Sequence, residues 1–263
     1  MQGAAIKQIA RSILNRTGYD IRRATELPPP APDIRHTVSF PEATYAPWLS
    51  DTEFQQLYRI IRKNTLVDRY RCYELWQLVA ESAKLVNGDL IEIGVWRGGT
   101  GALIARKCQL VGIEGTVYLC DTFKGIVKAG PLDPSYVGGE HANTTKEDVL
   151  GLLNALNLDR VSILEGIFPD ESKGVLDNHR FRLCHIDVDV YQSAKDIVSW
   201  IWPRLEYGGI IIFDDYGFRG CAGITRFVNE ERLNRDRLVL HNLNGHAVVI
   251  KLANDPPTTN STG

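Results

Sequence analysis

Two pairs of aspartates follow short apolar runs and have the composition of a metal site. Asp187 and Asp189 come just after one run, and Asp214 and Asp215 come just after the next. If the two runs form neighbouring parallel strands, their carboxyl ends share one edge of the sheet, and these four carboxylates would converge there. With no lysine or arginine expected nearby they would repel one another, and a bound divalent cation relieves such repulsion. Ligands that are all oxygen favour Mg²⁺, Mn²⁺ or Ca²⁺ over zinc.

The members of the first pair need not do the same chemistry. A strand places alternate residues on one side, so Asp187 and Asp189 would point the same way. One would ligate the metal, and the other, left uncoordinated, would accept a proton. The alternative is that two or more of the four aspartates cap helices or loops. His185, inside the apolar strand, is expected to be a buried structural imidazole.

A glycine-rich turn lies between an earlier apolar run and a helical segment. It runs from Gly94 through Gly98 to Gly101, and Glu92 stands two residues before its first glycine. Glycines let the backbone approach a ligand closely, and the N-terminus of a helix presents free N–H groups. The turn lacks the dinucleotide fingerprint G-x-G-x-x-G, and its acidic residue is typical of S-adenosylmethionine (SAM) methyltransferases. The alternative is a tight strand–helix connection without a ligand.

A second acidic strand end, Asp121, is a candidate for ribose binding. It directly follows the apolar run Val117–Cys120. A carboxylate at this position can accept hydrogen bonds from two ribose hydroxyls, in nicotinamide-binding and SAM-binding folds alike. The alternative is that Asp121 acts as an N-cap.

Other side chains near these motifs carry weaker expectations. His141, in a long loop, is a candidate substrate contact or second base. Arg69 and Arg71 are expected to be surface residues. Tyr191 and Tyr216 each follow an acidic pair, and lining the pocket and packing against the sheet edge are equally open for both.

Apolar runs alternate with amphipathic segments from residue 88 onward. The runs are Leu90–Val95, Val117–Cys120, Val161–Leu164, Leu183–Ile186, Ile210–Phe213, Leu238–Leu240 and Ala247–Ile250. The helix-length segments between them are Gly101–Cys108, Thr145–Leu156, Ser193–Trp202 and Ala222–Arg232. This alternation predicts an α/β fold whose parallel sheet is covered by helices on both faces. The short turn before the last run predicts a terminal antiparallel hairpin.

The rest of the chain divides into segments of different composition. Residues 1–34 combine a basic amphipathic helix with a proline-rich linker, and residues 253–263 read as a disordered tail. The basic helix suits a membrane surface, but docking on the same chain or on a second subunit is favoured. Residues 35–87 form a helical extension, with two helices and a break at 64–68, before a core at 88–252. Residues 124–144, rich in glycine and proline, predict a long loop of the kind that often acts as a lid.

The overall composition excludes several classes of protein. The 263 residues carry a formal charge of −2, which argues against holding nucleic acid by positive charge alone. No apolar run approaches the roughly 20 residues that span a bilayer. Five widely spaced cysteines predict buried free thiols in a reducing compartment, and therefore a cytoplasmic protein.

Taken together, the motifs resemble those of the metal-dependent macrocin O-methyltransferase (TylF-like) family, over roughly residues 60–251. The matching strings are E-x-G-V-W-R-G-G from Glu92, D-[ST]-F from Asp121, D-x-D-x-Y from Asp187 and D-D-Y from Asp214. The resemblance implies a class I SAM-dependent methyltransferase fold, which is Rossmann-like, with a seven-stranded, mostly parallel sheet. It also implies methyl transfer from SAM, with Mg²⁺, to a hydroxyl of a sugar, a sugar-containing natural product or a glycan. A homo-oligomer is expected.

The resemblance further implies roles for single residues. Asp187, Asp214 and Asp215 would be the Mg²⁺ ligands, and Asp189 would be the general base. The SAM site would comprise Glu92, Gly94, Val95, Trp96, Arg97, Gly98, Thr100, Asp121, Thr122, Phe123, Gly166, Ile167, Phe168 and Asp187. This chain departs from the family in having Val188 in place of the frequent glycine and Ile167 in place of a common tryptophan. The loop and the first 50 residues do not match, so the acceptor stays open.

Two other functions compete with this one. Catechol- and phenol-methylating enzymes of a similar type carry a lysine three residues after the first metal aspartate, where this chain has Val190. That difference favours an alcohol acceptor. A non-catalytic module that binds SAM or a metal is the other alternative, and the complete acidic set argues against it.

Overall fold

The computed structural model describes residues 34–37, 43–85, 87–171 and 173–253. The chain divides into two units, residues 1–42 and 43–263, and the elements described below belong to the second. The expected basic helix, the linker up to residue 33 and the tail from residue 254 lie outside the described residues.

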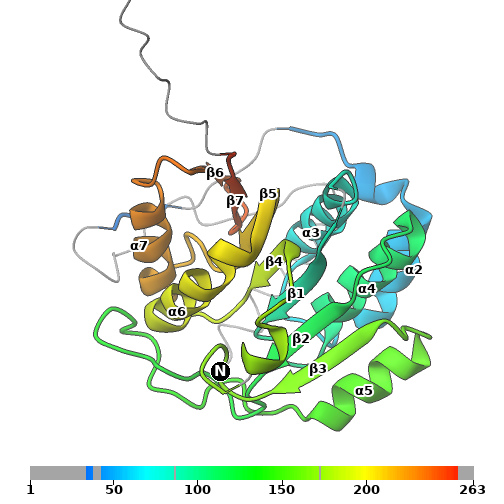
Figure 1. Cartoon of the computed structure of the whole chain (residues 1–263), viewed down its shortest axis with the longest axis horizontal. Coiled ribbons are helices and arrows are strands. Elements are labelled where there is room, and N and C mark those ends of the chain that lie inside the picture. The colour runs from blue at the N-terminus through cyan, green and yellow to red at the C-terminus, as the bar shows by residue number, and fades with distance from the viewer. Residues whose placement is uncertain (1–33, 38–42, 86, 172, 254–263) are drawn as a thin grey trace, which may run out of the picture. The chain divides into compact units, whose positions relative to one another are not determined.

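Seven strands form one sheet in the order β3-β2-β1-β4-β5-β7-β6 (Figure 1). Their bounds are β1 Asp89–Ile93, β2 Val117–Asp121, β3 Val161–Glu165, β4 Phe181–Ile186, β5 Leu205–Phe213, β6 Arg237–His241 and β7 Ala247–Lys251. The first five strands pair in parallel, whereas β7 is antiparallel to both β5 and β6. The mostly parallel sheet with an antiparallel terminal hairpin is therefore confirmed.

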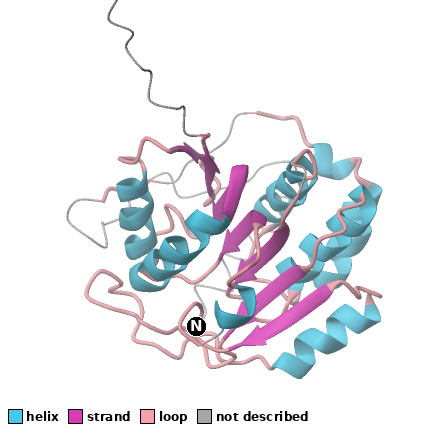
Figure 2. Ribbon diagram, viewed as in Figure 1, coloured by secondary structure: helices cyan, strands magenta, loops and turns pink. Residues whose placement is uncertain are grey.

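Helices cover both faces of the sheet (Figure 2). Their bounds are α2 Thr52–Ile61, α3 Arg69–Ser82, α4 Gly99–Val111, α5 Lys146–Ala155, α6 Tyr191–Ile201 and α7 Ala222–Glu231. Short 3₁₀ turns lie at η1 Pro47–Leu49, η2 Lys173–Leu176 and η3 Trp202–Arg204. Helices α2 to α5 lie on one side of the sheet and α6 and α7 on the other (Figure 1).

The alternation of side chains along each strand divides the core into two layers. Leu90, on β1, packs into the cluster under α2 to α5. Its neighbour Ile91 packs into the cluster under α6 and α7. Successive residues of a strand point to opposite faces, and helices cover both faces of this sheet. Most residues of a buried strand are therefore apolar, which gives a nearly continuous apolar run in the sequence.

Four parallel strands end at the same level, which builds one continuous edge. Ile93 pairs with Cys120 of β2 and with Ile186 of β4. Ile186 in turn pairs with Phe213 of β5. Each polar motif from the sequence directly follows one of these strand ends, so the register brings the motifs together.

Aspartates cap the N-terminal ends of α2 and α3, and the second of them marks the end of the break between the two helices. Asp51 accepts a hydrogen bond from the Phe54 amide at 3.0 Å and begins α2. Asp68 accepts from the amides of Tyr70 and Arg71 at 2.8 and 3.2 Å and begins α3. The expected two helices and the break between them are confirmed, and the break points toward the glycine-rich turn.

Gly94 allows β1 and β4 to approach closely at the shared edge. Its φ is +88°, and a Cβ added there would lie 1.8 Å from the Asp187 carbonyl oxygen. Its amide donates to the Cys120 carbonyl at 2.9 Å, which ties the turn to β2 as well. Only glycine fits this position, because both the backbone angle and the space exclude a side chain.

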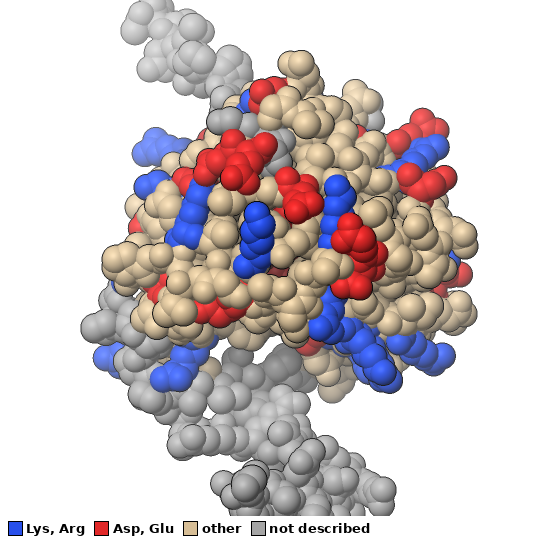
Figure 3. Space-filling view, turned by 90° about the horizontal axis from the view of Figure 1, so that it is seen from below, with Lys and Arg blue, Asp and Glu red and all other residues tan. Residues whose placement is uncertain are grey.

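Three further features concern the cysteines, the length of the apolar helices and the distribution of surface charge. All five cysteines are buried free thiols, as expected. In the described part of the chain, no helix is both long and apolar enough to cross a membrane. On the face shown in Figure 3, lysine and arginine side chains are interspersed with aspartate and glutamate.

We expect Gly94→Ala to destabilise the fold by more than backbone strain alone. Gly139→Ala is the matched control, because its φ is +89° and nothing lies within 4 Å of the added Cβ. Left-handed strain should cost the control about 1–2 kcal/mol of unfolding free energy. Gly94→Ala should lose at least about 2 kcal/mol more in urea denaturation. Equal losses would contradict the close approach of Gly94 to Asp187.

Candidate active site

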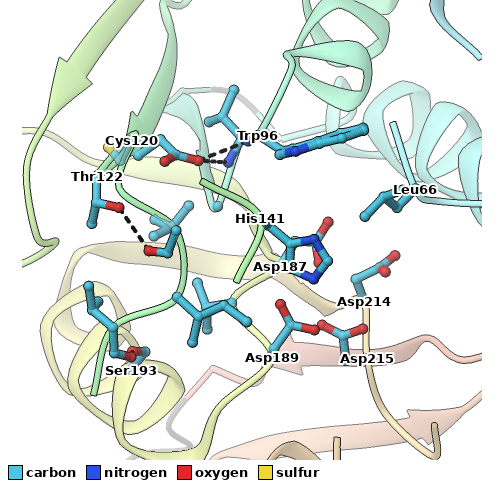
Figure 4. A pocket seen from close by; sticks show the side chains of 18 of the residues that line it. Leu66, Trp96, Cys120, Thr122, His141, Asp187, Asp189, Ser193, Asp214 and Asp215 are labelled. Atoms are coloured by element: carbon cyan, nitrogen blue, oxygen red, sulfur yellow. Dashed lines mark hydrogen bonds between the residues drawn. The ribbon is translucent and has the colours of Figure 1, made fainter. Parts of the chain in front are cut away.

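A cavity of about 390 Å³ opens at the carboxyl edge of the sheet. Its walls come from the ends of β1, β2, β4 and β5, from the α2–α3 break and from the loop before α5. In Figure 4, Asp187, Asp189, Asp214 and Asp215 gather on one side, and Trp96 and Thr122 lie across from them. A cavity of this size, largely apolar with a few converging polar groups, is typical of a small-molecule site.

Asp121 braces the glycine-rich turn. Its Oδ2 accepts hydrogen bonds from the amides of Val95 and Trp96 at 2.7 and 2.8 Å. Its Oδ1 accepts from the Phe123 amide at 2.7 Å. A carboxylate has about four acceptor positions, so one stays available to a ligand hydroxyl. Asp121 therefore binds backbone amides of the turns and is not the N-cap of α4 or α5, and it keeps one acceptor position for a ligand.

Most residues expected in the SAM site line this cavity. Those on the wall are Gly94, Val95, Trp96, Thr100, Asp121, Thr122, Gly166, Phe168 and Asp187. Glu92, Arg97, Gly98, Phe123 and Ile167 are not among the residues that line it. Arg97, for example, lies over the Trp96 ring at 4.6 Å and donates to the Asn143 carbonyl at 3.2 Å. These five residues would act on the cavity through the side chains or backbone they support.

Three of the four aspartates come within reach of one ion. Asp187, Asp214 and Asp215 each offer an oxygen, and these atoms lie within 4.8 Å of one another. Burial, followed by the charges of the neighbouring carboxylates, raises the pKa of Asp187 and of Asp215 well above the ordinary value. Asp215 Oδ2 is buried without a hydrogen-bond partner. An unsatisfied oxygen among crowded carboxylates is the environment in which a divalent cation binds.

Asp214 differs from its neighbours because basic side chains surround it. Arg71 Nη1 donates to its Oδ2, and His246 Nε2 lies 2.9 Å from its Oδ1. Burial alone would raise the pKa of Asp214, but the imidazoles of His185 and His246 and the charge of Arg71 lower it. The expectation of a surface role for Arg71 is therefore wrong, as is that of carboxylates without a nearby arginine. Arg71 is only 6% exposed, because the first turn of α3 lies at this edge, whereas Arg69 is exposed as expected.

A buried chain of acids and imidazoles runs behind the cavity. Glu92 Oε1 lies 2.8 Å from His185 Nδ1, and both side chains are fully buried. His246 Nδ1 lies 2.7 Å from Glu74 Oε2 on α3. Burial lowers the pKa of His185, but the carboxylates of Asp214 and Glu92 raise it by more. The pKa of His185 is therefore about 9, above its ordinary value. The expected burial of His185 is thus confirmed.

Sequence reasoning missed His246 and Glu74. His246 directly precedes β7, and β7 returns antiparallel beside β5. That pairing brings His246 next to Asp214, which follows β5. The predicted hairpin was the available signal, but the partner strand of β7 was not predicted.

The remaining candidates divide between the cavity and the core. His141 lines the cavity. Tyr191 packs against Phe227 and donates to Glu230 at 2.6 Å, and Tyr216 donates to Asn229 at 2.8 Å. Neither tyrosine is among the residues that line the cavity, so of the two expected roles both tyrosines have the packing role.

The long loop between β2 and α5 covers part of the cavity. It contributes Gly125, Ile126, Val127, Tyr136 and His141 to the wall. The expected long loop is confirmed, and its position over the site fits a role as a lid.

Solved structures place this fold in a known class. The O-methyltransferase NovP matches with a TM-score of 0.63 and 23% identity, over 72% of this chain and 83% of that one. The calicheamicin methyltransferase CalS11 matches with a TM-score of 0.58 and 17% identity, over 79% and 94%. The fold is that of the class I SAM-dependent methyltransferases.

The chain belongs to the macrocin-O-methyltransferase (TylF) family, whose sequence profile matches residues 61–249. A tetracenomycin-C rhamnosyl 4'-O-methyltransferase of Streptomyces olivaceus is 32% identical over 52% of this chain and 56% of its own length. Mycinamicin III 3''-O-methyltransferase of Micromonospora griseorubida is 30% identical over 52% and 58%. The chain thus spans less than two thirds of the length of these relatives.

Replacing Arg71 should destabilise the protein strongly. Arg71→Met leaves the buried Asp214 carboxylate without its guanidinium partner, and such a loss costs about 3–5 kcal/mol. The matched control Arg69→Met removes an exposed arginine from the same helix and should stay within about 0.5 kcal/mol. Chemical denaturation of both variants at neutral pH measures the difference. Similar stabilities would show that Arg71 does not compensate Asp214.

Proposed function

We propose that this protein is a SAM-dependent O-methyltransferase whose acceptor is a hydroxyl of a sugar, a sugar-containing natural product or a glycan. The observation that carries the proposal is that one cavity is lined by two kinds of wall. The glycine-rich turn with Asp121 forms one, and three clustered carboxylates with Asp189 beside them form the other. Family membership supports it, as does a relative whose name describes a rhamnosyl substrate.

The first wall suits the methyl donor. Gly94 keeps the backbone bare at the cavity, and the remaining acceptor position of Asp121 suits a ribose hydroxyl. The N-terminal residues of α4 bring Thr100 to the same wall. Gly166 closes this side, because its amide donates to the Asp121 carbonyl at 3.0 Å.

The second wall suits a magnesium ion. Asp187, Asp214 and Asp215 would hold it, since their oxygens are close together and one is unsatisfied. A bound Mg²⁺ lowers the pKa of a hydroxyl that it contacts. Arg71 and His246 leave each Asp214 oxygen a further acceptor position, so Asp214 can serve as a ligand while they hold it.

Asp189 would accept the proton of the acceptor. It lies outside the set of Asp187, Asp214 and Asp215, although one of its oxygens is also within 4.8 Å of an Asp215 oxygen and of Cys221 Sγ. Burial raises the pKa of Asp189 above its ordinary value, and a raised pKa makes a carboxylate a stronger base. The residues around it would hold the acceptor oxygen ~3 Å from the methyl carbon, in line with the departing sulfur.

The site favours an alcohol over a catechol. Val190, at the place of the lysine in catechol-type enzymes, is fully buried under the start of α6. In the described residues that line the cavity, the only arginine or lysine is Arg71, which is bound to Asp214. A phenolate-stabilising lysine is thus missing from this part of the protein.

Turnover tests the proposal directly. With SAM, Mg²⁺ and a glycoside that carries two adjacent free hydroxyls, we expect S-adenosylhomocysteine and a singly methylated product by mass spectrometry. The corresponding deoxy glycoside is the control. Asp189→Asn should bind SAM normally and lose roughly 10²–10⁴-fold in kcat. SAM binding without turnover on any diol would favour a non-catalytic module, and full activity of Asp189→Asn would rule out this base.

Magnesium should stabilise the protein more at about pH 8 than at about pH 5. Because the pKa values of Asp187 and Asp215 are raised, the metal-free protein loses stability as pH rises from the unfolded carboxyl value of about 4 through the raised values. Mg²⁺ offsets that loss by replacing the protons. Thermal melts at matched ionic strength measure the effect, and Asp215→Asn should weaken it. An equal Mg²⁺ effect at both pH values would contradict binding at this cluster.

A further inference from the structure

The long loop reaches across the cavity to the proposed base. Tyr136, in this loop, donates a hydrogen bond from its hydroxyl to Asp189 Oδ1 at 2.6 Å. Cys221 Sγ lies 3.6 Å from the same oxygen. Both contacts go to Oδ1, which leaves Oδ2 as the oxygen for an acceptor hydroxyl. Asp189 also has a φ of +64°, so its backbone stands in the left-handed region where neighbouring contacts must hold it.

A second set of contacts fixes where Tyr136 lies. Asp133 is 2% exposed, and its Oδ1 accepts a hydrogen bond from the Tyr191 amide at 2.9 Å. A Cβ on Gly223, in α7, would lie 1.9 Å from that oxygen, so only glycine leaves room for it. The Tyr136 amide donates to the Asp133 carbonyl at 3.0 Å. Asp133, three residues before Tyr136, therefore fixes the loop against the starts of α6 and α7.

We propose that Tyr136 is a positioning residue for Asp189, and that the Asp133–Gly223 contact sets the place of Tyr136. This inference rests on the proposed function. The phenol holds one carboxylate oxygen, so the other keeps a single direction toward the acceptor. The same loop that covers the cavity therefore also supplies the hydroxyl that orients the base.

The competing explanation is that the hydrogen bond only fastens the loop. Other contacts do that without touching Asp189. Lys128 Nζ bridges Asp170 and Asp196, each at 2.6 Å, and lies off the cavity wall. Lys128→Ala is thus a matched control, since it loosens the same loop and leaves the Tyr136 hydroxyl in place.

Steady-state kinetics with SAM, Mg²⁺ and a diol glycoside test the inference. Tyr136→Phe should lower kcat about 10- to 100-fold, the scale of a misplaced reacting group, with KM for SAM within about twofold. Lys128→Ala should stay within about twofold in kcat. Added to Asp189→Asn, Tyr136→Phe should have almost no further effect, because its partner is already altered. Gly223→Ala should repeat the loss of kcat, with SAM binding by calorimetry confirming that it is folded.

The outcomes separate this inference from the proposed function. If Asp189→Asn loses turnover while Tyr136→Phe keeps the wild-type kcat, the positioning role is overturned and the base stands. Equal losses in Tyr136→Phe and Lys128→Ala, or additive losses with Asp189→Asn, would show that the hydroxyl only fastens the loop. Full turnover of Asp189→Asn would overturn the base itself and the inference with it.

Discussion

Repulsion among buried carboxylates is the constraint on which the rest of the site depends. The register of β1, β4 and β5 delivers Asp187, Asp214 and Asp215 to one edge of the sheet, where burial makes each charge costly. The fold compensates only one of them fully, because Arg71 and His246 both bind Asp214. The other two keep raised pKa values, which leaves a deficit of positive charge in the cavity. A divalent cation is the ligand that this imbalance favours.

Different elements around the cavity position Arg71, the glycine-rich turn and Tyr136. Helix α3 begins at the edge, and its capping residue Asp68 also accepts from Arg71 Nε at 2.8 Å, so the start of the helix orients the guanidinium. The glycine-rich turn is braced by Asp121, which accepts from two of its amides. The loop before α5 supplies Tyr136 to the opposite wall. The surfaces proposed for donor, metal and acceptor thus come from different segments, and the shared strand edge joins them.

Much of this arrangement could be predicted, because strand periodicity and strand ends are local properties. Apolar runs with buried faces identified all seven strands, and the polar residues directly after them identified Asp121, Asp187 and Asp214. Neighbouring parallel strands must end at a common edge, so the convergence of the acids followed without the structure. Arg71 was misjudged because nothing near it in the chain indicates that α3 begins beside this edge.

The sequence by itself determined the strands, the acidic residues that follow them, the glycine-rich turn and the family, whereas the order of the strands came from the structure. Only the tertiary structure decided how the charges are balanced and how the base is held. Arg71, His246 and Tyr136 each reach the site from a segment far away in the chain, through a helix, a hairpin and a loop. Such contacts depend on how the elements pack together. The periodicity of one element shows which of its faces is buried but not which other element covers that face.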